Sequence, residues 1–398
     1  MPLPTTAFAT ACLPADGFAG TLIGRAWLPE SLSGGPAGPS PVWVNADGVY
    51  DLSSLAPTCA GLISRGLGRA DFLAAGLRRV ADTDALIANT LAATRDPALP
   101  WLLAPVDLQV IKACGVTFMC SMLERVIEER AGGDSGKAEA VRQLIGERIA
   151  GGIAGVRPGS PEAEELKAIL QSQGIWSQYL EVGIGPYAEV FTKAPVLSAV
   201  GTGEQVGLHP VSSWNNPEPE VVLIVDPTGR VVGATLGNDV NLRDIEGRSA
   251  LLLGKAKDNN ASCALGPLIR LFDDTFSLDD VRRMQVRVQV SGDDRFELDA
   301  ASDLSQISRD VLDLVAHTMG THHQYPDGIA LFTGTLFAPT QDRDGPGQGF
   351  THHLGDVVSI SSPKLGTLRN QVNLSTQAPP WLFGLSALIV NLAARKLL

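Results

Sequence analysis

With 398 residues, 44% of them hydrophobic and 19% charged, the chain is long enough for two domains, and its ordinary composition excludes wholesale disorder and a coiled coil. Its formal net charge of -12 comes without a basic patch, which excludes the electrostatic footprint of a nucleic-acid-binding protein. No stretch of 18 uninterrupted apolar residues occurs, and no basic segment precedes an apolar one at the N-terminus, so we expect neither a membrane span nor a signal peptide.

The first half of the chain is predicted to contain amphipathic helices. Apolar residues recur at helical spacing among charged ones over residues 73–95 and 119–149, and a pair of glycines interrupts the second run. A capping serine, Ser160, precedes a proline and two glutamates, which predicts a third helix that ends near Gln173. Such helices cover a core more often than they form an active site.

The second half is predicted to be rich in strands. Apolar runs bounded by turn residues predict strands over residues 189–193, 221–225, 231–236, 284–290, 296–298 and 329–335. A final helix is expected between residues 380 and 398. We therefore place a domain boundary near residue 180, with an α/β domain over residues 1–180 and a β-rich domain over residues 181–398.

Two glutamates precede the predicted strand over residues 221–225. Side chains on a strand alternate between its faces, so Glu218 and Glu220 point the same way. Pro219, between them, cannot donate a ladder hydrogen bond and therefore confines this stretch to a strand start or an edge.

A third carboxylate, Asp239, follows the second strand of the same predicted hairpin. If Asp226 faces Gly229 across the turn, the register sets Asp239 opposite Asn216 and on the face of both glutamates. Three carboxylates this close repel one another unless a cation lies among them. Ligands that are all oxygens favour Mg²⁺, with Mn²⁺ or Ca²⁺ as alternatives, over zinc. The spacing alone leaves open a solvated acidic edge.

Further residues extend this pattern in order and spacing. The chain continues through an Arg-Asp pair, a lysine and an Ala-Ser-Cys segment, namely Arg243-Asp244, Lys257 and Ala261-Ser262-Cys263. This ordered set is similar to that of the fumarylacetoacetate hydrolase superfamily. Two more segments resemble the superfamily's pattern, Phe191-Thr192-Lys193-Ala194-Pro195 and Gly334-Thr335. The similarity spans residues 105 to 375 approximately.

The resemblance implies an α+β fold, in which a C-terminal β-rich sandwich or roll of the fumarylacetoacetate hydrolase type follows a smaller α/β N-terminal domain. It implies a metal site whose ligands are Glu218, Glu220 and Asp239. It also implies that Lys257 acts on the substrate and that Lys193 and Thr335 contact it. A homodimer or higher homo-oligomer is expected on the same ground.

One segment departs from the pattern of the superfamily's hydrolases. These carry a histidine and, three residues later, a glutamate that together activate water; the corresponding residues here are Ser121 and Glu124. A serine cannot act as a base near pH 7, which counts against hydrolysis of a C–C bond and favours lyase chemistry. Ser121 is assigned to substrate binding and Glu124 to proton abstraction, although Glu124 is as well explained as one more acid on a charged helix. The family's glutamine after Arg-Asp is replaced by Glu246.

Within the superfamily, residues 214–220, 237–249, 324–328 and 341–344 are most similar to segments of bacterial 2-keto-3-deoxy-D-xylonate (D-arabinonate) dehydratases. This similarity implies dehydration of a short 2-oxo acid, a 2-keto-3-deoxy sugar acid, to 2,5-dioxopentanoate. A bound dication would chelate the C1 carboxylate and C2 ketone and acidify the C3 hydrogens, so that the C4 hydroxyl is lost. The alternatives are a hydrolase that cleaves a 2,4-dioxo acid to pyruvate, and a small-molecule binding protein without activity.

The cysteines bear on the compartment. Five of them are scattered along the chain without a Cys-x-x-Cys spacing, which fits a reducing compartment and argues against a zinc knuckle. We therefore expect a cytoplasmic protein.

Overall fold

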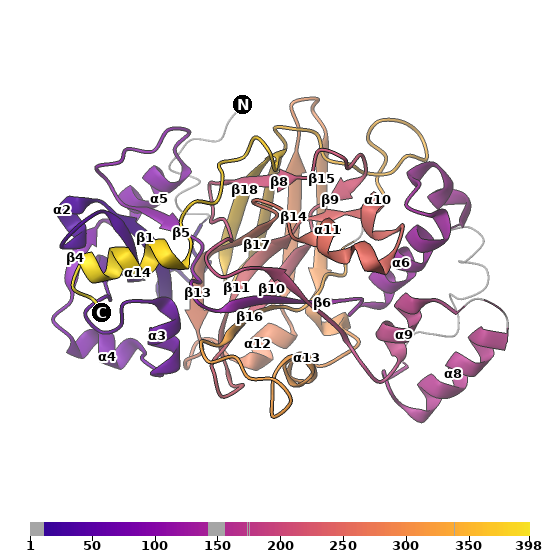
Figure 1. Cartoon of the computed structure of the whole chain (residues 1–398), viewed down its shortest axis with the longest axis horizontal. Coiled ribbons are helices and arrows are strands. Elements are labelled where there is room, and N and C mark those ends of the chain that lie inside the picture. The colour runs from indigo at the N-terminus through magenta and orange to yellow at the C-terminus, as the bar shows by residue number, and fades with distance from the viewer. Residues whose placement is uncertain (1–11, 142–155, 173, 175, 338) are drawn as a thin grey trace.

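The computed structural model describes residues 12–141, 156–172, 174, 176–337 and 339–398. A sheet of 11 strands runs through the middle of the molecule, and a sheet of five strands packs on one of its faces (Figure 1). In pairing order, the larger sheet contains β4 (Arg78–Ala81), β3 (Gly48–Asp51), β2 (Gly38–Asn45), β1 (Thr21–Leu28), β13 (Cys263–Leu271), β11 (Val231–Asp239), β10 (Pro219–Val225), β16 (Ile329–Phe332), β6 (Val110–Gly115) and β7 (Glu189–Ala194), with β5 (Trp101–Leu103) also paired to β1.

The smaller sheet contains, in pairing order, β15 (Glu297–Asp303), β14 (Gln285–Ser291), β17 (Val357–Ser362), β18 (Gly366–Leu374) and β8 (Gln205–Leu208). A two-stranded ribbon pairs β9 (Asn215–Asn216) with β12 (Asn241–Leu242). The helices are α2 (Glu30–Ser33), α3 (Cys59–Ser64), α4 (Arg69–Ala74), α5 (Thr83–Leu91), α6 (Met119–Ala131), α8 (Pro161–Ser172), α9 (Gln178–Ile184), α10 (Arg243–Glu246), α11 (Leu253–Lys257), α12 (Leu278–Arg282), α13 (Val311–Thr318) and α14 (Leu385–Ala394).

Strand β10 is covered on both faces, as its continuous apolar run predicts. Val221 and Leu223 belong to a core that they share with strands of the smaller sheet. Val222 and Ile224, on the opposite face, belong to a second core that includes residues of α3 and α4. The hairpin of β10 and β11 is therefore held rigidly in the centre of the molecule, and residues at its open end are fixed in position.

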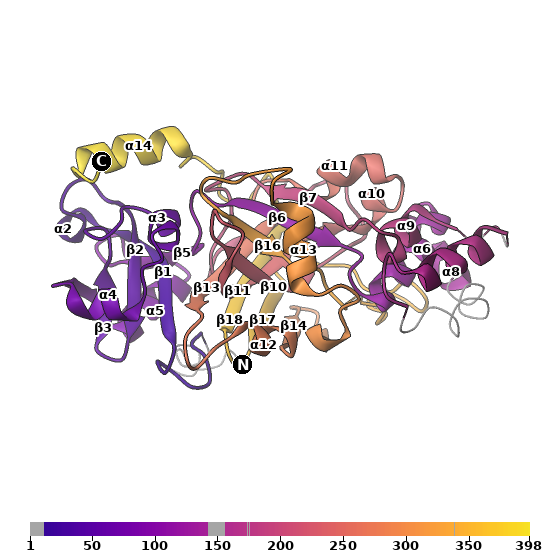
Figure 2. The same cartoon turned by 90° about the horizontal axis from the view of Figure 1, so that it is seen from below.

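The C-terminal helix returns to the N-terminal elements, which comprise residues 21–103. In Figures 1 and 2, α14 lies along this part of the molecule. Asn391 donates a hydrogen bond to Ala37 O at 2.9 Å, and Arg395 donates to Pro39 O at 2.7 Å. Helix α14 is thus packed against the N-terminal elements. No helix among the described residues combines the length and apolarity that crossing a membrane requires.

The α+β fold class is confirmed, and each predicted strand overlaps an observed one. The strand predicted over residues 329–335 is too long, because β16 ends at Phe332 and Gly334 has a φ of 90°. The helix predicted over residues 73–95 is wrong in its middle. Residues 78–81 form the edge strand β4, where Arg78 pairs with Asp51 of β3, so non-local pairing overrides the helical spacing.

The other predicted helices are present where the structure describes them, but the final helix is shorter than predicted, since α14 spans Leu385–Ala394. Helix α6 ends at a left-handed Gly132, and residues 142–149 of the predicted run lie outside the described residues. Helix α8 reaches Ser172. The domain boundary near residue 180 stays a prediction; β6 precedes it and β7 follows it, and these two strands pair in the larger sheet.

Candidate active site

The β10–β11 hairpin has a longer turn than the sequence suggested. Asp226 N donates to Arg230 O at 2.9 Å, and a bulge follows between β10 and β11. The predicted register is therefore wrong by two residues, and Asp239 lies opposite Glu218, to whose carbonyl its N–H donates at 3.1 Å, rather than opposite Asn216. Because side chains alternate with a period of two, a shift of two residues leaves each side chain on its predicted face.

Glu218, Glu220 and Asp239 meet at the open end of this hairpin. One carboxylate oxygen from each lies within 4.8 Å of the other two, and the residues are only 2–3% exposed. Burial, then the charges of Asp239 and Glu218, raise the pKa of Glu220 well above its usual range. The solvated acidic edge that the spacing left open is excluded, because the three carboxylates are buried together.

Two lysines partly compensate this negative charge. Lys257 Nζ lies 2.5 Å from Glu218 Oε2 and 3.1 Å from Asp239 Oδ2. Lys193 Nζ lies 2.7 Å from Asp239 Oδ1 and donates to the carbonyl oxygens of Val240, at 3.2 Å, and of Lys257. Burial acts to raise the pKa of Asp239, but these two lysines outweigh it and hold that pKa below its usual value.

The predicted roles of the two lysines differ in how well the geometry supports them. Lys257 lies between two of the carboxylates and faces the ring of Phe191, whose centroid is 5.7 Å from Nζ. Lys193 is 0% exposed and directs its ammonium group at Asp239 and backbone carbonyls. Its contact with substrate stays a prediction, and the arrangement supports a role in holding Asp239.

The surroundings of the three carboxylates fit a hard divalent cation. The donor set is made of carboxylate oxygens alone, which suits Mg²⁺, Mn²⁺ or Ca²⁺. Nearby buried amide atoms have no hydrogen-bond partner among the described residues, namely Asn216 Oδ1, Asn238 Nδ2, Asn241 Nδ2 and Asn241 Oδ1. Buried polar atoms of this kind are normally satisfied by ordered water or an ion. The residues present therefore fit a hydrated metal ion held by Glu218, Glu220 and Asp239.

The segment after β16 also reaches the carboxylates. Gly334 N donates to Glu220 Oε2 at 2.6 Å. A Cβ atom at Gly334 would lie 1.9 Å from Thr117 Oγ1, so only glycine allows this approach. Thr335 follows, and its Oγ1 accepts a hydrogen bond from Phe337 N at 3.1 Å. Thr335 therefore directly follows, in the sequence, a residue that hydrogen-bonds to Glu220. Its contact with substrate stays a prediction.

Helix α6 carries the two residues that depart from the hydrolase pattern. Ser121 Oγ donates to Phe118 O at 3.0 Å. Glu124 Oε2 lies 3.4 Å from Arg243 Nη2. Both side chains are engaged within the protein, so their roles in substrate binding and proton abstraction stay predictions.

The sequence did not point to Arg125, although it lies at the centre of the site. Its guanidinium group contacts Glu218, lies 2.6 Å from Glu128 Oε2 and lies 3.3 Å from Glu246 Oε2. The pairing of Arg125 with Glu128 is visible in the sequence as a basic and an acidic residue three positions apart on one helix. Its contact with Glu218 has no local signal.

Glu189 is a second residue that the sequence did not point to. It shares a strand face with Phe191, whose ring centroid lies 5.7 Å from Lys257 Nζ. Its carboxylate makes no hydrogen bond or ion pair with another described residue, and a Cβ atom at the opposite Gly115 would lie 2.1 Å from its Oε2. Burial, then the charge of Glu246, raise the pKa of Glu189 to about 7. In the sequence, the available signal for Glu189 was its position two residues before Phe191, in a segment that resembles the family's pattern.

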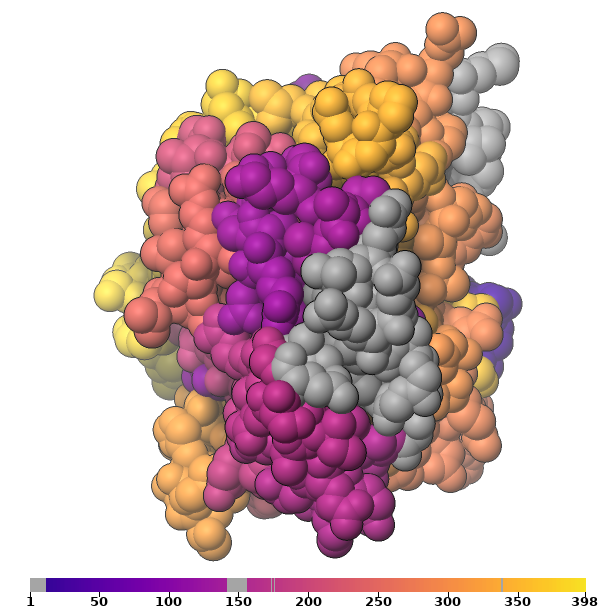
Figure 3. All heavy atoms as spheres, turned by 90° about the vertical axis from the view of Figure 1, so that its right-hand side faces the viewer, coloured from indigo at the N-terminus to yellow at the C-terminus, as the bar shows by residue number. Residues whose placement is uncertain are grey.

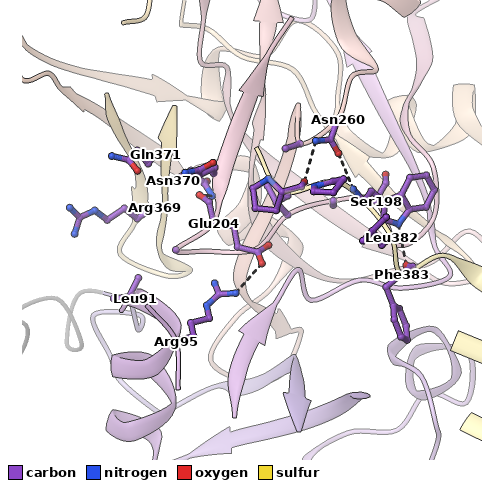
Figure 4. Close-up of a pocket in the computed structure, with 18 of the residues that line it drawn as sticks. Leu91, Arg95, Ser198, Glu204, Asn260, Arg369, Asn370, Gln371, Leu382 and Phe383 are labelled. Atoms are coloured by element: carbon purple, nitrogen blue, oxygen red, sulfur yellow. Dashed lines mark hydrogen bonds and ion pairs between the residues drawn. The ribbon is translucent and has the colours of Figure 1, made fainter. Parts of the chain in front are cut away.

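A cavity of about 740 Å³ lies elsewhere, between the N-terminal elements and the segment before α14 (Figure 4). Arg95 pairs there with Glu204 at 3.1 Å, and Asn260 donates to Pro379 O at 3.2 Å. The described residues that line it include none of the predicted site residues. This cavity is therefore separate from the carboxylates.

Comparison with known proteins agrees with the resemblance. Residues 186–373 match the family described as fumarylacetoacetate (FAA) hydrolase C-terminal. A probable 2-keto-3-deoxyxylonate dehydratase of Haloferax volcanii is 31% identical over 194 residues, which are 49% of this chain and 63% of that protein. A 2-dehydro-3-deoxy-D-arabinonate dehydratase of Saccharolobus solfataricus is 28% identical over 183 residues, 45% of this chain and 57% of that protein. The matches thus span less than two thirds of these relatives.

Among solved structures, a 2-keto-3-deoxy-D-arabinonate dehydratase complexed with magnesium and 2,5-dioxopentanoate has a similar fold. The TM-score is 0.61 at 18% identity, over 89% of this chain and 99% of that one. The three carboxylates and Lys257 lie inside the matched residues 186–373, whereas helix α6 precedes them. Residues 186–373, a little under half of the chain, thus match the fumarylacetoacetate hydrolase family.

Proposed function

We propose that the protein dehydrates a 2-keto-3-deoxy sugar acid, with 2-keto-3-deoxy-D-xylonate or D-arabinonate as substrate and 2,5-dioxopentanoate as product. The observation that carries this proposal is the buried group of Glu218, Glu220 and Asp239 with Lys257 among them. The names of the two curated relatives and the magnesium and 2,5-dioxopentanoate of the similar structure support it. Ser121, in place of the histidine of the hydrolases, supports dehydration over hydrolysis.

The chemistry divides between the ion and the residues of this chain. When bound, Mg²⁺ would withdraw electron density from the C1 carboxylate and C2 ketone and make the C3 hydrogens more acidic. Lys257 offers a buried positive charge for the substrate carboxylate. A carboxylate of the site removes one C3 proton, the C4–O bond breaks with loss of the hydroxyl as water, and tautomerisation of the product gives an aldehyde at C5. One water is lost in total.

Two carboxylates are candidates for the base that removes the C3 proton. The sequence puts the base at Glu124, which the structure pairs with Arg243 at 3.4 Å. Glu189 lies on the same strand face as Phe191, whose ring contacts Lys257, and has no ion pair among the described residues. A base with a pKa near the working pH is effective, and the pKa of Glu189 is raised to about 7. We infer that Glu189 takes this role.

Glu189→Gln is therefore expected to lower kcat by about 10²-fold or more, since general bases contribute ~10² to 10⁴. Because the carboxylate must be ionised to accept a proton, kcat of the wild type should fall as the pH drops below about 7. A bound dication would lower the pKa of Glu189 and move this fall in kcat to lower pH. Exchange of the C3 hydrogens in D₂O, followed by NMR, reports the same step without product release. Glu124→Gln is the matched comparison, and a larger loss in that variant would return the base to Glu124.

The hydrolase alternative is tested with two substrates. The protein should convert 2-keto-3-deoxy-D-xylonate to 2,5-dioxopentanoate and leave 2,4-dioxo acids essentially uncleaved. Product identification by mass spectrometry decides between them. Efficient release of pyruvate from a 2,4-dioxo acid would reject dehydration in favour of hydrolysis.

A further inference from the structure

An ion-pair network joins helix α6 to the proposed metal ligands. Arg125, on α6, contacts Glu218 with Nη2, and its Nη1 lies 2.6 Å from Glu128 and 3.3 Å from Glu246 of α10. Arg243 Nε lies 2.7 Å from the other oxygen of Glu128. The side chains of all five residues are at most 12% exposed. Figure 3 views this end of the molecule, where α6 lies beside the segment that contains α10 and α11.

The network contains a further acid, Glu246, whose charge acts on the proposed ligand Glu218. Glu246 adds a buried negative charge near three carboxylates that already repel one another. A buried charge is tolerated only when a partner of opposite charge contacts it. Arg125 is that partner at 3.3 Å, and it belongs to a helix outside the residues that match the family.

The geometry of Arg125 does more than balance charge. Glu218 Oε1 accepts from Arg125 and Glu218 Oε2 accepts from Lys257, so both oxygens of this proposed ligand have a partner. The planar guanidinium group ties Glu218 to Glu128 and Glu246 through two different nitrogen atoms. A lysine at this position could supply the charge, but its single nitrogen could not hold the three acids in a fixed relation.

We propose that Arg125 is a positioning residue of the active site, which fixes the orientation of Glu218 toward the other metal ligands and balances Glu246. The inference rests on the metal site of the proposed function. It does not depend on which reaction follows metal binding. Residues that orient metal ligands in this way typically change metal affinity by about 10- to 100-fold when they are replaced.

The test uses a double substitution that leaves net charge unchanged. Arg125→Gln with Glu246→Gln removes one positive and one negative charge, and Glu128 keeps Arg243 as its partner. Binding of Mn²⁺ to the purified protein, measured by electron paramagnetic resonance of the free ion, should weaken by about 10- to 100-fold. Arg125→Lys keeps the positive charge but loses the planar guanidinium group. This variant should also bind Mn²⁺ more weakly than the wild type and have a lower kcat.

The control is a charge-neutral double substitution of an exposed ion pair, Arg282→Gln with Asp310→Asn, whose atoms lie 2.7 Å apart. It should bind Mn²⁺ as the wild type does. Wild-type affinity for Mn²⁺ in both Arg125 variants would overturn the positioning role and show that Arg125 only balances charge. If the double variant does not fold, Arg125→Lys decides by the same comparison. A wild type that does not bind Mn²⁺ would instead reject the metal site of the proposed function.

Discussion

Glu218→Gln, Glu220→Gln and Asp239→Asn should each abolish detectable turnover. Each substitution replaces one of three buried carboxylates whose oxygens lie within 4.8 Å of one another. A metal ion acting as Lewis acid contributes several kcal/mol to the transition state, and each 1.36 kcal/mol is tenfold in rate, so a loss of about 10³-fold or more is expected. Removal of metal by chelation should likewise abolish the activity of the wild type, and added Mg²⁺ should restore that activity.

A control for this prediction lies on the same hairpin. Asp226→Asn makes the same chemical change at the closed end, where Asp226 accepts hydrogen bonds from Thr228 and Arg230. This variant should keep its activity and its response to Mg²⁺. Steady-state rates before and after dialysis against a chelator measure both effects. Full activity after exhaustive removal of metal would contradict the assignment of the three carboxylates.

Lys257→Ala should lose about 10²-fold or more in kcat, because removal of a buried group that stabilises charge costs ~10² to 10³. Burial alone would lower the pKa of Lys257, but Asp239 and Glu218 outweigh it and raise that pKa above its usual value. The ammonium group is therefore positive and poorly suited to form an imine. The variant should still bind Mn²⁺, since it removes a positive charge 2.5 Å from a proposed ligand.

The matched control for Lys257 is Lys255→Ala on the same short helix. Lys255 is exposed and its Nζ lies 3.3 Å from His209 Nε2. That variant should retain wild-type kcat. A substrate adduct on Lys257 that borohydride traps would show imine chemistry and overturn the proposed role of the charged lysine.

The grouping of Glu218, Glu220 and Asp239 could be predicted from the sequence even though the predicted turn was wrong. Asp226-Pro227-Thr228-Gly229 reads as a tight turn, but the Asp226 side chain accepts from the backbone of Thr228 and Arg230 and stabilises a longer one. The bulge that follows adds a second residue. Because these two errors sum to one strand period, Asp239 kept its predicted face.

The residues around the ligands could not be predicted in the same way. Arg125 lies 93 positions before Glu218, and no pattern on α6 indicates which acid in the other half of the chain it contacts. Lys193 matches a family motif, yet only the fold shows that its ammonium group is directed at Asp239. Edge strand β4 was missed because its pairing with β3 is non-local. Local patterns thus predicted most of the elements and the grouping of the three carboxylates, while contacts between distant segments required the structure.

The most direct test of metal-dependent dehydration is one NMR time course with 2-keto-3-deoxy-D-xylonate and two samples of the protein. One sample is freed of metal by chelation, and the other is then reloaded with Mg²⁺. Signals of 2,5-dioxopentanoate are expected only in the reloaded sample, with substrate unchanged in the other. Equal formation of 2,5-dioxopentanoate in both samples, or cleavage of the substrate to pyruvate, would contradict metal-dependent dehydration.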